Sequence, residues 1–129
     1  MIHRRTFLGS VAASLAAPAI LPAADAPRKR LAIVTNVWHY LSHAWHMGER
    51  FLHGYPINGK WHQPPFEVVA AYVDQVPKND LSRDRAKQFG FKIYPTVAET
   101  LRCGGKSLAV DAVLVISRKS TRLNSSHRT

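Results

Sequence analysis

Short apolar runs alternate with segments of helical spacing along the middle of the chain. Four runs are predicted strands, and the longer ones are nearly continuous and rich in β-branched residues, which is typical of buried parallel strands. They cover residues 31–38, 66–73, 91–94 and 110–116. Because a single helix is predicted between most successive strands, the pattern indicates βαβ units and therefore an α/β fold with a parallel sheet.

The three predicted helices cover residues 42–53, 81–89 and 96 to about 104. In the first, the apolar positions fall on one side at helical spacing: Leu41, Ala44, Met47, Phe51 and Leu52. The second is a charged segment closed by Gly90. The third opens with Thr96 and Glu99, which have the spacing of a capping box.

The remaining segments are predicted turns and one long loop. Residues 54–65 are dense in glycine, proline and asparagine, so they are predicted to be a loop, and residues 76–80 are predicted to turn the chain. Right-handed crossovers then give a partial Rossmann-like, doubly wound parallel sheet of about four strands. The predicted domain covers residues 27–116, and it is incomplete.

The N-terminus is predicted to be an export signal over residues 1–26. Arg4 and Arg5 are followed by Phe7 and Leu8 and then by an alanine-rich run with two prolines, which resembles a twin-arginine signal. A plain secretory signal is the alternative. A stable membrane span is not predicted, because it needs about 20 strongly apolar residues and this run is shorter, rich in alanine and broken by two prolines. The signal predicts a periplasmic or extracellular location and makes the twin-arginine export machinery a partner.

The last residues, 117–129, are predicted to be non-native. Back-translation of residues 118–127 gives, in one frame, an adapter commonly ligated to DNA fragments before short-read sequencing. Scars of this kind are excluded from fold reasoning. The expectation is therefore a truncated domain that is inactive as a fragment.

The net charge of +10 comes largely from the two ends of the chain. Residues 31–116 hold nine Lys and Arg against seven Asp and Glu, a net charge of only +2. Phosphate backbones are bound by basic stripes, so no nucleic-acid partner is predicted. Cys103 is the one cysteine, which excludes an intramolecular disulfide.

Residues 82–101, followed by Val-Asp-Ala-Val at 110–113, resemble the N-terminal domain of the Gfo/Idh/MocA oxidoreductases. That pattern is a helix with Arg-Ala-Lys, a glycine, a short strand, a capped helix and then Val-Asp-Ala-Val. An exported group related to that family resembles the chain more closely. The resemblance implies a Rossmann-like fold, NAD(P) as cofactor and a small carbohydrate-like substrate, with Asn36 and Asp74 beside the cofactor. Asp74 is equally interpretable as a turn former.

The chain departs from the family at two places. The G-x-G-x-x-G fingerprint that lets backbone approach a pyrophosphate is missing, because no glycine stands between Thr35 and Gly48. Trp38 and Tyr40 are expected to crowd that position. The family's catalytic lysine belongs to a Glu-Lys-Pro segment that this sequence does not contain, so no catalytic residue is carried over.

Four histidines form a second constellation. One continuous helix would align His39, His43, His46 and His53 on a single face. His43 and His46 are three residues apart, a spacing at which helical histidines share a metal, but no third ligand is clearly spaced, so no metal is assigned. These histidines are therefore predicted either to contact a substrate or phosphate or simply to form the solvent-exposed side of the helix. The three tryptophans, Trp38, Trp45 and Trp61, are candidates for either a sugar-binding cleft or packing.

Two functions follow from the sequence. The first is the nucleotide-binding-like domain of an exported oxidoreductase related to the Gfo/Idh/MocA family. The alternative is an exported non-redox relative, a binding or hydrolytic protein that kept the fold and lost the dinucleotide site.

Overall fold

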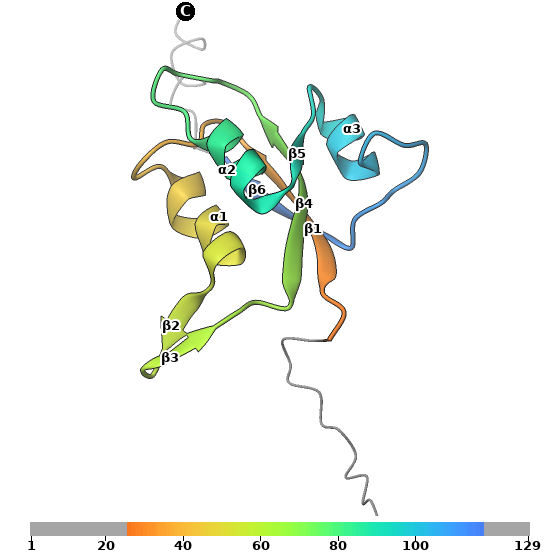
Figure 1. Ribbon diagram of the computed structural model, residues 1–129. Helices are drawn as coiled ribbons and strands as arrows, with labels where there is room; N and C mark the ends of the chain where they lie inside the picture. Colours follow the sequence, from red (N-terminus) through yellow and green to blue (C-terminus); the bar gives the residue numbers. More distant parts are fainter. Residues whose placement is uncertain (1–25, 118–129) are drawn as a thin grey trace, which may run out of the picture.

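The computed structural model describes residues 26–117, so the predicted signal and adapter-like tail lie outside the described residues except for positions 26 and 117. Four strands form one parallel sheet in the order β5-β4-β1-β6 (Figure 1). Their bounds are β1 (Lys29–Thr35), β4 (Phe66–Val73), β5 (Lys92–Ile93) and β6 (Ala112–Ile116). This confirms the predicted α/β fold with a parallel sheet of four strands. The strand order, third, second, first and fourth along the chain, is compatible with a Rossmann-like half.

The helices cover both faces of the sheet. They are α1 (His43–His53), α2 (Ser82–Phe89) and α3 (Val97–Arg102). Side chains of α1 and α2 pack on the cluster around Ile33, whereas α3 packs on the cluster around Ala32 and Ala70 on the opposite face. Consecutive residues of β1 therefore point into different layers, as the alternation of a strand requires.

Capping residues mark the ends of the helices, and those at Gly90 and Thr96 were predicted. Ser42 caps α1, and its hydroxyl accepts a hydrogen bond from the Trp45 amide. Thr96 caps α3 in the same way through the Glu99 amide, which confirms the serine- or threonine-type cap of that helix. Gly90 ends α2 in the left-handed conformation that glycine adopts without steric cost.

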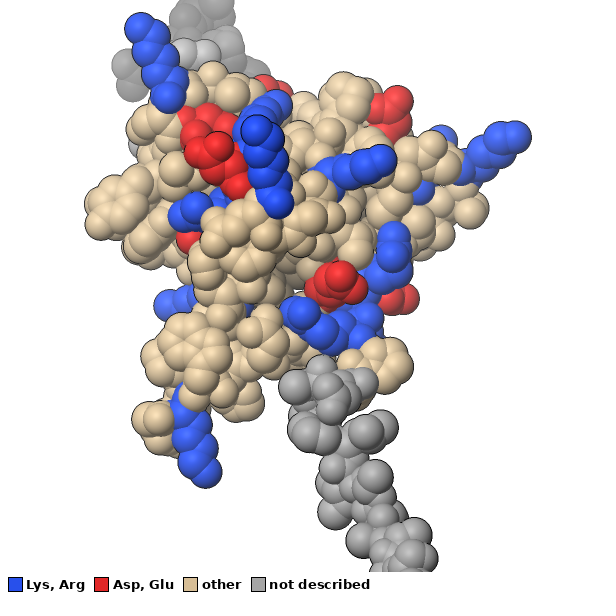
Figure 2. All heavy atoms as spheres, viewed as in Figure 1, with Lys and Arg blue, Asp and Glu red and all other residues tan. Residues whose placement is uncertain are grey.

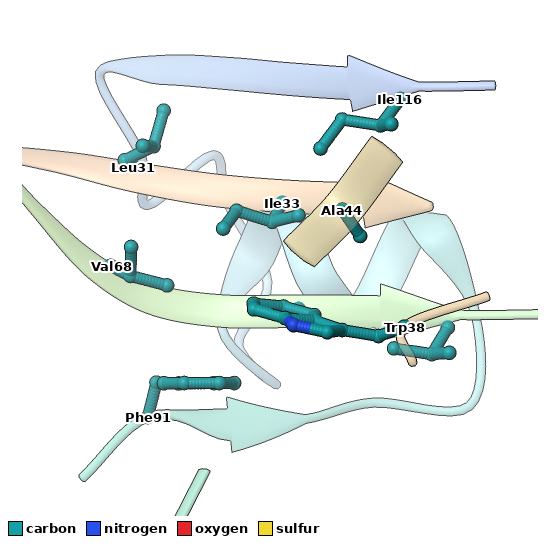
Figure 3. Packing of buried hydrophobic residues seen from close by; sticks show 9 residues of the cluster. Leu31, Ile33, Trp38, Ala44, Val68, Phe91 and Ile116 are labelled. Carbon is teal, nitrogen blue, oxygen red and sulfur yellow. The ribbon is translucent and has the colours of Figure 1, made fainter. Parts of the chain in front are cut away.

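The first strand ends earlier than predicted, and Trp38 lies outside it. β1 stops at Thr35, and the chain then turns so that the Trp38 indole is fully buried beneath α1. The indole stacks on Phe91 with ring centroids 6.0 Å apart, and Figure 3 shows it beside Ile33 and Ala44. The apolar run in the sequence does not reveal this turn, because apolar residues are buried both in a strand and in a loop that packs into the core.

Residues 54–65 were predicted to be a loop, and this prediction is wrong for most of the segment. It contains an antiparallel hairpin of β2 (Tyr55–Ile57) and β3 (Lys60–His62), which extends away from the sheet below α1 (Figure 1). The turn is Asn58-Gly59, and both residues have positive φ angles of 50° and 77°. This dipeptide is the favoured two-residue turn of a β-hairpin, and the density of turn formers around it concealed the signal.

The surface of the described residues carries charges of both signs. Figure 2 shows Lys and Arg interspersed with Asp and Glu on the visible face. One ion pair, Arg85 with Glu49 at 2.7 Å, joins α2 to α1. Among residues 26–117, no helix is both long enough and apolar enough to cross a bilayer.

Candidate functional site

A cleft of about 260 Å³ lies at the carboxyl ends of β1 and β6. It is lined by the end of β1, the loop after it, the first turn of α1 and the last residue of β6. The lining residues are Thr35, Asn36, Val37, His39, Leu41, Ser42, His43, Ala44 and Ile116. The chain crosses from β1 to β4 on one side, and β6 pairs with β1 on the other, so the cleft lies where the strand order reverses. Open α/β sheets bind ligands at this switch point.

Ser42 fixes the geometry between the loop and α1. Its hydroxyl accepts hydrogen bonds from the amides of His39 at 3.2 Å and Trp45 at 3.1 Å. The amides of His43 and Ala44, in the first turn, have no acceptor within the helix. Both residues line the cleft. The cleft therefore has the partial positive charge of a helix N-terminus, which favours an anionic group.

Leu41 forms part of the cleft wall in an unfavourable backbone conformation. Its φ angle is 66°, and its side chain is 58% exposed. A branched residue at positive φ is strained by contact between its Cβ and the backbone. Such strain persists only where the surroundings determine the conformation, here Ser42 and the burial of Trp38 on either side of Leu41.

The two residues predicted beside a cofactor differ in their position relative to the cleft. Asn36 lines the cleft, and its carbonyl accepts a hydrogen bond from the Gln75 amide at 2.8 Å. Asp74 follows β4 at the same edge of the sheet, and its amide donates to the Thr35 carbonyl at 3.0 Å. Asp74 is not among the residues that line the cleft. The structure therefore brings the two residues to neighbouring strand ends but not into one cavity.

The Asp74 carboxylate has a partner on the preceding strand, β4. It accepts a hydrogen bond of 3.0 Å from the Tyr72 hydroxyl. This hydrogen bond, and the negative charge of Asp74 beside it, raise the pKa of Tyr72 above its ordinary value. Asp74 is thus a solvent-exposed hydrogen-bond acceptor at the edge of the sheet.

Removing the Asp74 carboxylate is expected to lower the pKa of Tyr72 towards the ordinary tyrosine value of about 10. The sign follows because the carboxylate favours the protonated phenol, so Asp74→Ala makes ionisation easier. Ultraviolet titration of the phenolate measures the shift, and a Tyr72→Phe variant identifies which transition belongs to this residue. An unchanged high-pH transition in Asp74→Ala would contradict the assigned cause.

The four histidines do not form one site. His39 precedes α1, where its backbone pairs with Asp80 and its Nδ1 lies 2.9 Å from the Tyr40 carbonyl oxygen. His43 lines the cleft, whereas His46 and His53 line a separate groove along α1. One continuous helix would have been needed to align all four, and α1 begins only at His43, so His39 lies before it. Among the described residues, no group of three or more histidine, cysteine or acidic side chains converges as a metal site.

The expected crowding of the cleft by aromatic rings is also wrong. The Trp38 ring is in the core, and Tyr40 lies outside the cleft with its ring against the edge of Trp45 at a centroid distance of 4.9 Å. Gly48, the first glycine after β1, faces the core instead of the cleft. A Cβ built on it lies 3.4 Å from both Ile33 and Trp38. Its small size therefore serves the packing of α1 on the indole.

Comparison with known proteins adds no relative. No family model, no curated protein and no solved structure matches the chain.

Proposed function

We propose that this chain is the nucleotide-binding N-terminal domain of an exported NAD(P)-dependent oxidoreductase related to the Gfo/Idh/MocA family. The observation that carries the proposal is the cleft at the strand-order reversal, where the first turn of α1 meets the carboxyl end of β1. Bound NAD(P) would supply hydride transfer with a small carbohydrate-like substrate. The chain by itself is expected to bind nucleotide without turnover, because no catalytic residue is assigned within it.

The first turn of α1 is proposed to hold the pyrophosphate. The amides of His43 and Ala44 donate to phosphate oxygens, and the His43 imidazole lies on the same cleft wall. At about 260 Å³ the cleft is smaller than pockets that enclose a whole drug-sized ligand, which span roughly 300–1,000 Å³. We therefore expect the cleft to hold the diphosphate while the nucleosides lie along the edge of the sheet.

Asn36 and Asp74 are proposed to contact the ribose. Asn36 is in the cleft wall at the end of β1, and Asp74 is exposed at the end of the neighbouring strand. The Asp74 carboxylate has acceptor capacity beyond the single bond from Tyr72, because its two oxygens accept several hydrogen bonds. A ribose lying across the ends of β1 and β4 would present its hydroxyls to both side chains.

The alternative function is an exported non-redox relative without a dinucleotide site. It is favoured by Leu41, whose side chain stands in the loop where the fingerprint would have glycines. A phosphate approaching backbone amides closely would meet that side chain. Under this alternative, the cleft takes a small polar ligand and no nucleotide.

Calorimetric titration of the full chain with NAD⁺, NADP⁺ and ADP-ribose tests the proposal. We expect a dissociation constant of about 1 mM or tighter for at least one of them. The decisive variants are His43→Ala, which removes the imidazole, and His43→Pro, which also removes the amide hydrogen. Proline is tolerated at the first helical position, and Ser42 already has the extended φ and ψ angles of −72° and 164° that suit a residue before proline.

The two variants separate the backbone from the side chain. If the amide binds phosphate, His43→Pro weakens binding by about tenfold relative to His43→Ala, as expected for a hydrogen bond to a charged group of about 1.5 kcal/mol. Nucleotide affinity that is the same in both variants and the wild type would place the ligand elsewhere. Absence of any nucleotide binding would favour the non-redox alternative.

A further inference from the structure

A second concave site lies between α1 and the β2–β3 hairpin, separate from the cleft at the strand ends. This groove has a volume of about 420 Å³ and is bordered by two tryptophans from different elements. We call it the tryptophan groove and define it by Trp45, His46, Glu49, Arg50, His53, Gly54 and Trp61. It shares no lining residue with the cleft. In Figure 2 the hairpin at the lower left presents mostly uncharged side chains around this region.

Trp61 is exposed and yet held in a fixed position. Its side chain is 66% exposed, but the indole Nε1 donates a hydrogen bond of 3.0 Å to the His53 carbonyl. Gly54 allows this close approach, because a Cβ at that position would lie 2.8 Å from Nε1 and 2.5 Å from the His62 carbonyl oxygen. An exposed aromatic ring tied to the end of a helix is a flat apolar surface facing the groove and the solvent.

Trp45 supplies the second ring. It is half-buried on α1 and makes edge-to-face contacts with the rings of Tyr40 and His46, both at centroid distances of 4.9 Å. These edge-to-face contacts restrict the rotamer of Trp45 and so reduce the entropy lost on binding.

Hydrogen-bonding groups also line the tryptophan groove. The Glu49 carboxylate is held by Arg85 at 2.7 Å and lies 3.4 Å from His53. Arg50 is exposed, and among the described residues it is in no ion pair. His46 adds an imidazole. The groove therefore combines a carboxylate acceptor with guanidinium and imidazole donors, and its charges of both signs do not select a strongly charged ligand.

We propose that the tryptophan groove binds a pyranose saccharide. A pyranose ring has one face of C–H groups, which packs on an indole, and a rim of hydroxyls that donate and accept hydrogen bonds. Rigid tryptophans beside a carboxylate, a guanidinium and two imidazoles match both properties. A purely apolar ligand would desolvate the Arg50 guanidinium without giving it a hydrogen-bond partner, which is unfavourable. The inference does not depend on nucleotide binding in the cleft.

The test is calorimetric titration of the full chain with cellobiose and with maltose. The expected dissociation constant is about 1 mM, the weak affinity of an open site. Trp61→Ala is expected to weaken binding at least about tenfold, while Trp61→Phe, which keeps an aromatic surface, loses less. Leu108→Ala is the matched control, because Leu108 is an equally exposed apolar residue (71%) outside the groove.

The outcomes separate cleanly. Binding of either saccharide that is lost in Trp61→Ala and kept in Leu108→Ala supports the proposal. No heat with either sugar, or equal affinity in Trp61→Ala and the wild type, overturns it. A tryptophan-dependent response to an aromatic peptide without any response to the sugars would also overturn it. Because the two sites share no residue, NAD⁺ titration of the same variants reports separately on the cleft.

Discussion

Trp38→Ala is expected to lower the free energy of unfolding by about 3–5 kcal/mol, the usual loss for a large buried aromatic residue. The indole is fully buried, stacks on Phe91 and packs against Gly48, and its Nε1 donates to Glu49 at 3.4 Å. Its removal leaves a cavity under α1, between the helix and the sheet (Figure 3). Small domains have only about 5–15 kcal/mol of total stability, so this loss is a large share of it.

Urea denaturation followed by circular dichroism measures this loss. Trp61→Ala is the matched control, since it deletes the same side chain where it is exposed and has a single hydrogen bond to the His53 carbonyl. That variant is expected to lose no more than about 1 kcal/mol. Similar losses in the two variants would contradict the placement of Trp38 in the core.

Gly54→Ala is expected to destabilise the chain by about 3 kcal/mol, the upper end of the cost of severe backbone strain. Gly54 has φ 81° and ψ −174°, a region that is accessible essentially to glycine alone. A Cβ would also lie 2.5 Å from the His62 carbonyl oxygen, which belongs to the backbone and cannot rotate away. The substitution therefore strains the chain and pushes the hairpin from the end of α1.

Gly59→Ala provides the comparison because it changes the same residue type at nearly the same φ. Gly59 has φ 77° at the hairpin tip, and a Cβ there would meet nothing within 4 Å. Its expected cost is only about 1 kcal/mol, the intrinsic penalty of the left-handed conformation. Urea denaturation of both variants gives the difference. Equal losses would show that the hairpin does not press against Gly54.

The sequence was most informative where local chemistry and burial agree. The strand over residues 66–73 was predicted with its exact bounds, because it is buried on both faces and flanked by proline and aspartate. Ser42, Gly90 and Thr96 marked helix ends because capping is a local interaction between a side chain or glycine and the adjacent backbone.

The errors arose where long-range packing decides the conformation. Whether Trp38 continues a strand or turns into the core depends on the space between α1 and Phe91, which local patterning does not encode. The hairpin could have been predicted, because Asn58-Gly59 lies between short segments containing aromatic and β-branched residues.

The candidate site was predicted only in part. Asn36 lies in the cleft wall because β1 ends at Thr35, at the edge where parallel strands of such folds bind ligands, whereas the predicted strand ran on to residue 38. Asp74 reached the same edge, but its distance from the cleft depends on the sheet register and on the twist between β1 and β4. The tryptophan groove required the hairpin, so the pairing of Trp45 with Trp61 was not visible in the sequence.

The central claim is that a nucleotide occupies the cleft at the first turn of α1. The most direct measurement is backbone amide chemical-shift mapping of the isotope-labelled chain during titration with NAD⁺ or ADP-ribose. The account predicts the largest shifts at Asn36, His43 and Ala44, with smaller shifts at Asp74. Shifts confined to the tryptophan groove or to α3, or no shifts at all, would contradict it.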